Sequence, residues 1–412
     1  MQAWARCSPV NDLLRNAIHQ LVGWGKLSAW PSENEAQAGD LPASVVVSSN
    51  PSGHFRRDLA RQGYTRARRF AVLPSDTSPR WLFPLENGRC AREGLRIYAP
   101  YATAARVLRG LLSVIVAARC QGFVPHKLLV ASRGSLPLEA LVREVTGESE
   151  TVFALSLGAP NRFRKLTIQV MRPDGGILGY IKLPLTEAAT QRVRHEAEVL
   201  ERLGNFAALR GHIPKVLHAA EGENGCILFQ SGGPSRPGPI QFNDLHEDFL
   251  RKLRGLHRVQ KPAETLVNEV AARWQKAAPL LDSRWRALGE AALLSASREL
   301  RGVMIPCGVT HGDFAPWNTR VGDGRLYAFD WESAAWDAPI AWDLFHFHVQ
   351  VASLLNKNGK GVLSLGRSSG ERASFMLYML DFVCRHLEER AQLGHAGLRY
   401  RQRLLSKELS RV

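Results

Sequence analysis

The first third of the chain alternates between strand-like and helix-like segments. Short apolar runs at residues 44–47 and 68–73 predict strands, and apolar residues at helical spacing predict helices over 55–62 and 103–120. No motif with evident chemistry lies in this part of the sequence. The pattern predicts a small α/β unit over residues 1–122, for which the sequence indicates no role.

A domain boundary is predicted near residues 121–126, where Gly122 and Pro125 interrupt the apolar pattern. The chain after it is rich in β-type runs, at 127–130, 152–157, 166–171 and 178–183. The last two runs flank Arg172-Pro-Asp-Gly-Gly176, a sequence typical of a tight turn. We therefore expect a small β-rich lobe over about residues 123–233.

From about Asn243 onward the helical period dominates, and we expect helices over 244–258, 263–278 and 282–300. These segments predict a larger helical lobe over about residues 234–400. A strand-rich segment followed by a helix-rich one indicates the α+β fold class.

Composition and cysteine spacing limit the class of protein. Of the 412 residues, 45% are hydrophobic and 22% are charged, which is typical of a globular protein of two or three domains. No apolar run reaches the ~18 residues of a membrane-spanning helix, and the N-terminus does not resemble a secretory signal. The six cysteines form no CxxC pair, so we expect neither a zinc site nor a disulfide framework, and a cytoplasmic location.

The formal net charge of +16 indicates an anionic partner such as a nucleotide, a sugar phosphate, nucleic acid or an acidic membrane surface. A solvated basic surface without a dedicated ligand explains it equally well. No nucleic-acid-binding motif accompanies the charge, so we expect no specific nucleic acid partner. The sequence does not indicate the oligomeric state.

Polar residues with evident chemistry gather between residues 311 and 332. The run His311-Gly-Asp-Phe-Ala-Pro-Trp-Asn318 precedes two β-type runs that are separated by Gly322-Asp-Gly324. A hairpin there would place Asn318 and Asp330 at its same end, close enough to share a cation. Phosphoryl transfer needs such groups, namely a carboxylate for the attacking hydroxyl and oxygen ligands for Mg²⁺.

This segment, with Asp330-Trp-Glu332, resembles the signature of the aminoglycoside phosphotransferase and choline kinase family. Asp337, and Asp343 directly before Leu344, also match the sequence pattern of that family. The resemblance covers roughly residues 125–400, and it implies a protein-kinase-like bilobal fold for 123–400.

By this resemblance the protein would transfer the γ-phosphate of ATP to a hydroxyl of a small molecule. Asp313 would be the catalytic base, and Asn318 and Asp330 would hold Mg²⁺. His311 would orient the loop, and Asp343 would support it.

Two residues in the small lobe fit the same activity. Lys182 lies in the third β-run of the lobe, where such kinases place the lysine that binds the α- and β-phosphates. A helix is expected over 187–203, and its helical angle places Glu196 at the edge of the apolar stripe. We expect Glu196 to pair with Lys182, although each could simply be solvated.

The phosphate-binding loop departs from the protein-kinase pattern. The turn Leu157-Gly158-Ala-Pro-Asn161 lacks GxGxxG, so Gly158 and nearby amides would bind the phosphates, with Asn161 ending a shortened loop. The Ser231-Gly-Gly-Pro234 segment is expected to be the hinge between the lobes.

Two features are interpreted as structural. The histidines of Phe345-His-Phe-His348 diverge by about 200° on a helix and cannot share a metal, so they are expected to serve packing. The basic segment 398–411 is expected to be a solvated amphipathic helix, with weak association to an acidic membrane surface as the alternative.

The sequence thus predicts a cytoplasmic small-molecule kinase. The acceptor is expected to be a small molecule such as a sugar, an amino sugar or an amino alcohol. Because the net charge is positive, a sugar, a glycan precursor, an amino alcohol or an anionic metabolite is at least as compatible as a polycationic aminoglycoside. The alternative is a nucleotide-binding pseudokinase, and the only feature that supports it is the altered phosphate-binding loop.

Overall fold

The computed structural model describes residues 45–49, 53–85, 87–97, 103–117, 124–158, 160–222, 225–355, 368–388 and 395–411. Contacts divide the chain into two compact units, and each is described by itself. The first contains the chain up to Ala197 together with Lys215–Gly232, and the second contains Glu198–Pro214 and the chain from Gly233 onward. An irregular segment is expected from the sequence over residues 1–45, and all of it except Val45 lies outside the described residues.

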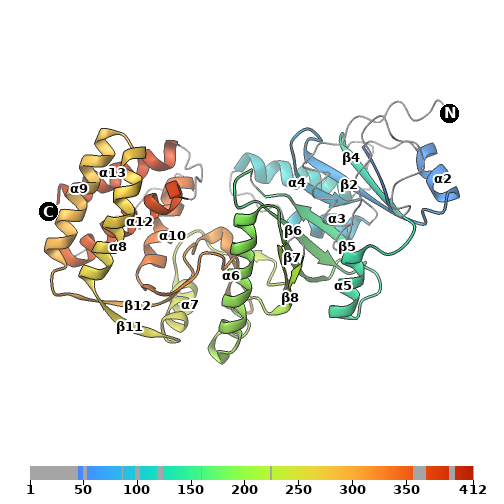
Figure 1. Cartoon of the computed structure of the whole chain (residues 1–412). Helices are drawn as coiled ribbons and strands as arrows, with labels where there is room; N and C mark the ends of the chain where they lie inside the picture. Colours follow the sequence, from blue (N-terminus) through green and yellow to red (C-terminus); the bar gives the residue numbers. More distant parts are fainter. Residues whose placement is uncertain are drawn as a thin grey trace. The chain divides into compact units, whose positions relative to one another are not determined.

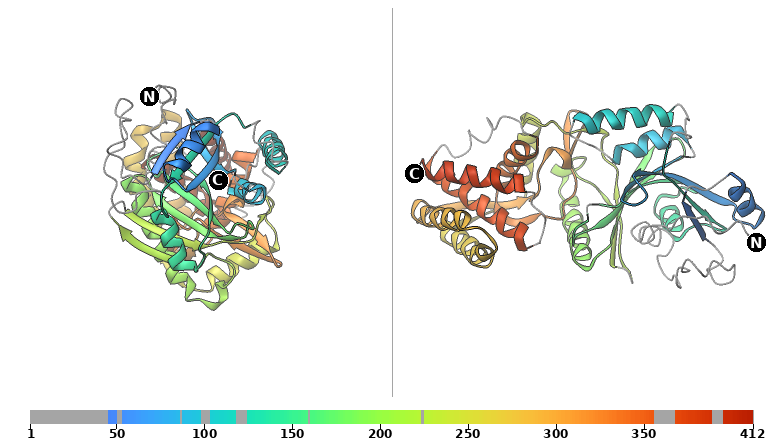
Figure 2. Two further views of the ribbon diagram at one scale, coloured as in Figure 1. Left: turned by 90° about the vertical axis from the view of Figure 1, so that its right-hand side faces the viewer. Right: turned by 90° about the horizontal axis from the view of Figure 1, so that it is seen from above.

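The first unit is built on one nine-stranded sheet with the order β1-β4-β2-β3-β5-β6-β7-β9-β8 (Figures 1 and 2). All its neighbouring strands are antiparallel. The strands are β1 (Val45–Ser49), β2 (Arg66–Pro74), β3 (Pro79–Pro84), β4 (Lys127–Ser132), β5 (Val152–Ser156), β6 (Lys165–Met171), β7 (Ile177–Pro184), β8 (Val216–Gly222) and β9 (Gly225–Ser231).

Both faces of this sheet are covered, because alternate residues of its strands are buried on opposite sides. On β2, Phe70 and Val72 belong to one apolar core, whereas Ala71 belongs to another. α5 packs against the first core, and α3 and α4 pack against the second. The helices of this unit are α2 (Gly53–Arg61), α3 (Gly88–Gly94), η1 (Leu95–Ile97), α4 (Thr103–Ala117), α5 (Pro137–Thr146) and α6 (Glu187–Gly204), whose last residues fall in the second unit.

The boundary expected near residue 122 falls within this sheet. Strand β3, before it, pairs with β5, after it, through Trp81↔Ser156 and Leu82↔Leu155. The pattern of apolar residues shows where strands begin and end, but it does not show which strands pair. The 123–233 lobe and the strands before it therefore share one sheet.

The second unit contains two three-stranded sheets, of order β10-β13-β14 and β11-β12-β15. Their strands are β10 (Arg236–Pro237), β11 (Arg258–Pro262), β12 (Met304–Thr310), β13 (Thr319–Gly322), β14 (Arg325–Ala328) and β15 (Ala335–Pro339). The hairpin predicted around Gly322-Asp-Gly324 is confirmed, with Thr319 opposite Ala328 and Gly322 opposite Arg325. It fixes the place of the residues on either side of it.

Helices make up the rest of the second unit. In Figure 1, α8 and α9, in yellow, pack with α12 and α13, in red. A single apolar core joins α8, α9, α10 and α12. The helices are η3 (Ala207–Leu209), α7 (Asp244–Arg254), α8 (Ala263–Ala277), η4 (Ala278–Leu280), α9 (Ser283–Glu299), η5 (Pro316–Asn318), α10 (Trp342–Leu355), α12 (Ser369–Glu388) and α13 (His395–Leu409).

Two expectations for this unit are corrected. The helix expected over 244–258 ends at Arg254. Arg258 instead begins strand β11, because this segment pairs with β12. The terminal helix α13 is not solvated on its inner side: Leu405 and Arg401 are buried where the helix packs on α9, α10 and α12. Among the described helices, none is long and apolar enough to cross a membrane.

Candidate active site

The segment from His311 to Asn318 is a loop that follows β12, and a side chain of α10 fixes its backbone. Asp343, in the first turn of α10, is buried and accepts two backbone hydrogen bonds. Its Oδ2 lies 2.7 Å from the amide nitrogen of His311, and its Oδ1 lies 2.9 Å from that of Gly312. A carboxylate that accepts two amides fixes the backbone of the loop, which is the support expected of Asp343.

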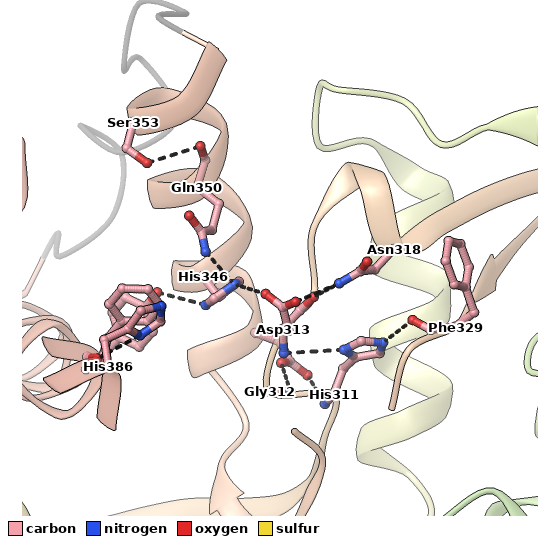
Figure 3. Close-up of polar contacts among 12 residues, drawn as sticks. His311, Gly312, Asp313, Asn318, Phe329, His346, Gln350, Ser353 and His386 are labelled. Carbon is pink, nitrogen blue, oxygen red and sulfur yellow. Dashed lines mark hydrogen bonds and ion pairs between the residues drawn. The ribbon is translucent and has the colours of Figure 1, made fainter. Parts of the chain in front are cut away.

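His311 ties the same loop to the end of the hairpin. The amide of Asp313 lies 3.3 Å from Nδ1, so Nδ1 accepts and Nε2 carries the proton. Nε2 then donates to the carbonyl oxygen of Phe329 at 3.0 Å (Figure 3). The fully buried ring also lies 4.6 Å, between centroids, from the indole of Trp331. His311 thus holds the loop against the chain that precedes Asp330.

The carboxylate of Asp313 is held from two sides. Asn318 Nδ2 donates to Oδ2 at 2.8 Å and to the Asp313 carbonyl oxygen at 2.9 Å. His346 Nε2 lies 2.8 Å from Oδ1 (Figure 3). About a third of the side chain (36%) stays exposed. Asp313 is thus oriented by protein groups and still accessible to a reactant.

The surroundings of Asp313 act in opposite directions on its pKa. Burial works to raise it, but the hydrogen bond with His346 and the electrostatic influence of His346 and His311 hold the pKa of Asp313 below its ordinary value. The carboxylate is therefore ionised at neutral pH. An ionised carboxylate with partial access can accept a hydrogen bond or a proton from a hydroxyl.

The hairpin brings the two expected metal ligands to one end. The amide of Phe329 donates to the Asn318 carbonyl oxygen at 3.0 Å, so Asp330 follows directly across from Asn318. Asp330 adopts a positive φ of 70°, an uncommon conformation for a non-glycine residue. Since Nδ2 of Asn318 faces Asp313, its Oδ1 is turned the other way. A carboxylate and an amide oxygen are donors suited to Mg²⁺, so these residues fit the predicted role.

In the first unit, the expected ion pair between Lys182 and Glu196 is present. Lys182 Nζ lies 2.6 Å from both carboxylate oxygens of Glu196, and both side chains are almost fully buried, at 4% and 0% exposure. β7 presents the lysine and α6 presents the glutamate. The pair fixes the ammonium group in one position.

The loop after β5 is compact. Gly158 has φ +62°, and a Cβ there would lie 2.9 Å from the carbonyl oxygen of Lys165, so glycine is required. Asn161 Oδ1 accepts from the amide of Phe163 at 2.9 Å, which turns the loop back towards β6. Its oxygen thus shapes the loop. The expected hinge at 231–234 coincides with the division between the units at Gly232 and Gly233.

Sequence reasoning missed His346. The interpretation that both histidines serve packing is wrong for His346, which also contacts Asp313, whereas the ring of His348 does pack, 5.4 Å from that of Phe242 between centroids. His346 lies on the same face of α10 as Asp343, one turn later, and so it also faces the loop. That spacing, Asp followed by His three residues on, was the signal available in the sequence.

A cavity of about 270 Å³ adjoins the loop within the second unit. Gly312 and His346 form part of its wall, and Tyr378 extends it along α12. Across the cavity, Asp381 pairs with Arg273 at 2.9 Å and with Arg385 at 2.7 Å. Charges of both signs therefore line a space next to the loop.

Replacing Gly312 by alanine is expected to destabilise the loop. Gly312 has φ +76°, and an added Cβ would lie 2.0 Å from the carbonyl oxygen of Ser333, so the backbone would have to move. We expect the free energy of unfolding to fall by about 3 kcal/mol or more. Gly324→Ala is the matched control: φ is +68° there, but the space is open, and the cost should be about 1 kcal/mol. Equal unfolding midpoints in calorimetry for the two variants would contradict this reasoning.

Residues 179–355 match the model of the phosphotransferase enzyme family, APH, which confirms the predicted resemblance over that segment. No protein in the curated comparison matches the chain in sequence.

Three solved structures illustrate the likeness. The GDP complex of wild-type aminoglycoside 2'-phosphotransferase-IIIa is 15% identical, with a TM-score of 0.45 over 66% of this chain and 98% of that one. A thermostable mutant of APH(4)-Ia with AMP-PNP and hygromycin B is 14% identical, with a TM-score of 0.46 over 66% and 98%. The gentamicin complex of APH(2")-IIa is 13% identical, with a TM-score of 0.41 over 68% and 97%.

Proposed function

We propose that the protein is a small-molecule kinase that transfers the γ-phosphoryl group of ATP to a hydroxyl of its acceptor. The observation that carries this proposal is the Asp313 carboxylate, which is ionised, held by Asn318 and His346, and still partly exposed. It lies on a loop whose backbone is fixed by Asp343. The match of residues 179–355 to the phosphotransferase family supports the same activity.

In the proposed mechanism Asp313 accepts the hydrogen bond of the acceptor hydroxyl and directs its oxygen towards the γ-phosphorus. Asn318 and Asp330 would hold Mg²⁺, which would supply positive charge to offset that of the phosphate oxygens. As the oxygen–phosphorus bond forms and the bond to the β-phosphate breaks, Asp313 takes up the hydroxyl proton. ADP and the phosphorylated acceptor are the products.

The first unit would bind the nucleotide. Lys182, fixed by Glu196, would bind the α- and β-phosphates, and the amides around Gly158, with the turn held by Asn161, would surround them. The proposed phosphotransferase domain comprises residues 123–400. We propose the reducing cytoplasm as the location: among the described residues, Cys90, Cys226, Cys307 and Cys384 are buried and form no disulfide.

The lining of the cavity beside the loop bears on the class of acceptor. The neighbouring structures include complexes with hygromycin B and gentamicin. The cavity beside the loop, however, carries arginines as well as carboxylates, so it does not select for cations by charge alone. Sugars, amino sugars, amino alcohols and sugar phosphates are all compatible with it.

The test is phosphate transfer to a panel of these four acceptor classes, with ATP and, separately, GTP. We expect transfer to at least one acceptor, loss of at least about 100-fold when EDTA removes Mg²⁺, and recovery when Mg²⁺ is added back. The product is identified by mass spectrometry, because ATP consumption alone does not separate transfer from hydrolysis. A protein that binds neither nucleotide would contradict the proposal. Nucleotide binding without transfer to any of the acceptors would favour the pseudokinase.

A further inference from the structure

A chain of buried polar side chains leads from Asp313 into the helical core of the second unit. His346 Nε2 lies 2.8 Å from Asp313 Oδ1, and His346 Nδ1 lies 3.1 Å from the hydroxyl of Tyr378. Gln350, one turn further along α10, places its Nε2 3.1 Å from His346 Nε2 (Figure 3). His346 and Tyr378 are buried among apolar side chains, so their polar atoms depend on these partners.

The donors and acceptors in this series of side chains determine how His346 acts on Asp313. Arg401 Nη2 donates to Gln350 Oε1 at 3.3 Å, and this fixes the amide so that Gln350 presents its nitrogen to His346. A nitrogen that donates cannot accept the Nε2 proton, and an ionised carboxylate can only accept. Asp313 is therefore the acceptor for Nε2–H among these partners.

The other ring nitrogen of His346, Nδ1, faces the Tyr378 hydroxyl, which can either donate or accept a hydrogen bond. The Tyr378 hydroxyl can donate to Nδ1 when the ring is neutral and accept from it when the ring is protonated. Burial raises the pKa of Tyr378, so its hydroxyl keeps its proton. In both states of the ring, Nε2–H stays directed at Asp313.

α10 also supplies the brace of the loop. Asp343 and His346 are three residues apart, so one face of one helix fixes the backbone of the loop through Asp343 and one oxygen of its carboxylate through His346. Asn318 holds the other oxygen. Two donors in different directions leave the carboxylate little freedom to rotate.

We propose that His346 is a positioning residue for the phosphoryl transfer, and that its Nε2–H, whose ring is held at Nδ1 by Tyr378, holds Asp313 in the orientation that receives the acceptor hydroxyl. This inference rests on the proposed function, since it concerns the base of that reaction. It assigns a role to a histidine that does not itself touch a reactant.

The kinetic test compares His346→Ala, His346→Gln and His348→Ala. The alanine variant should lower kcat about 10- to 100-fold, with the KM for nucleotide changed by less than about 2-fold. Glutamine can place an amide N–H where Nε2–H was, so it should recover most of the lost kcat. His348→Ala, two residues further along α10, should keep the wild-type kcat. Wild-type kcat in His346→Ala, or a glutamine variant as slow as alanine, would overturn the role.

A second measurement does not depend on the acceptor or on the stability of the alanine variant. With ¹⁵N-labelled histidine, the resonance missing in His346→Gln identifies the His346 ring nitrogens. They should shift in Asp313→Asn, because the carboxylate that accepts from Nε2–H is replaced. Unchanged shifts would overturn the inference even for an active kinase. A clear shift in a protein that transfers no phosphate would instead remove only the proposed function.

Discussion

Asp313→Asn is expected to lower kcat by about 1,000-fold while leaving the affinity for nucleotide within about 3-fold. The asparagine side chain is nearly the same size, so it fits between Asn318 and His346, but its amide accepts from only one of these two donors. It cannot take up the proton of an acceptor hydroxyl, and it has no negative charge to attract that hydroxyl. Steady-state transfer and calorimetric titration with nucleotide measure the two quantities separately.

The control for this variant is Asp323→Asn. Asp323 lies at the tip of the same hairpin with φ 51°, a conformation that asparagine also tolerates. It should retain wild-type kcat and stability. If Asp313→Asn kept more than about a tenth of the wild-type kcat, Asp313 would not be the base. A parallel loss of nucleotide affinity would indicate a misplaced loop instead.

Local patterns in the sequence predicted most individual elements, because apolar periodicity is a local property. β6 and β7 with their turn, α6, α8 and α9 lie within a few residues of their expected positions. The pairing of β3 with β5 could not be predicted, since it joins residues more than 70 positions apart. The same holds for β11, whose strand conformation depends on β12.

The site was predictable to the extent that spacing fixes geometry. The hairpin brings Asn318 and Asp330 together whatever surrounds it, and helical angle places Glu196 towards Lys182. His346 was missed because its function depends on how α10 crosses the loop, a tertiary contact. For the same reason Arg401 was taken as a solvated residue of a terminal helix. Its guanidinium is instead buried over the ring of Phe382, at 4.1 Å, where it reaches Gln350.

Lys182→Met is expected to lower the free energy of unfolding of the first unit by about 3–5 kcal/mol. Methionine fills a similar volume but leaves the fully buried Glu196 carboxylate without its main cation. Glu196→Gln should be destabilising in the same way, because it removes the carboxylate charge that lies 2.6 Å from the buried ammonium group. Calorimetric scans measure these losses, and the two units need not unfold together.

The double variant Lys182→Met/Glu196→Gln separates the structural contribution of the pair from its proposed function. The double variant removes both charges of the buried pair together, so stability should return to within about 1–2 kcal/mol of the wild type. Affinity for nucleotide should not return, because the group proposed to bind the phosphates is absent. Recovery of both would mean that Lys182 serves only the fold. Single variants as stable as the wild type would mean that the ammonium and the carboxylate are not paired in solution, and Lys182 would then lack the fixed position on which its proposed role depends.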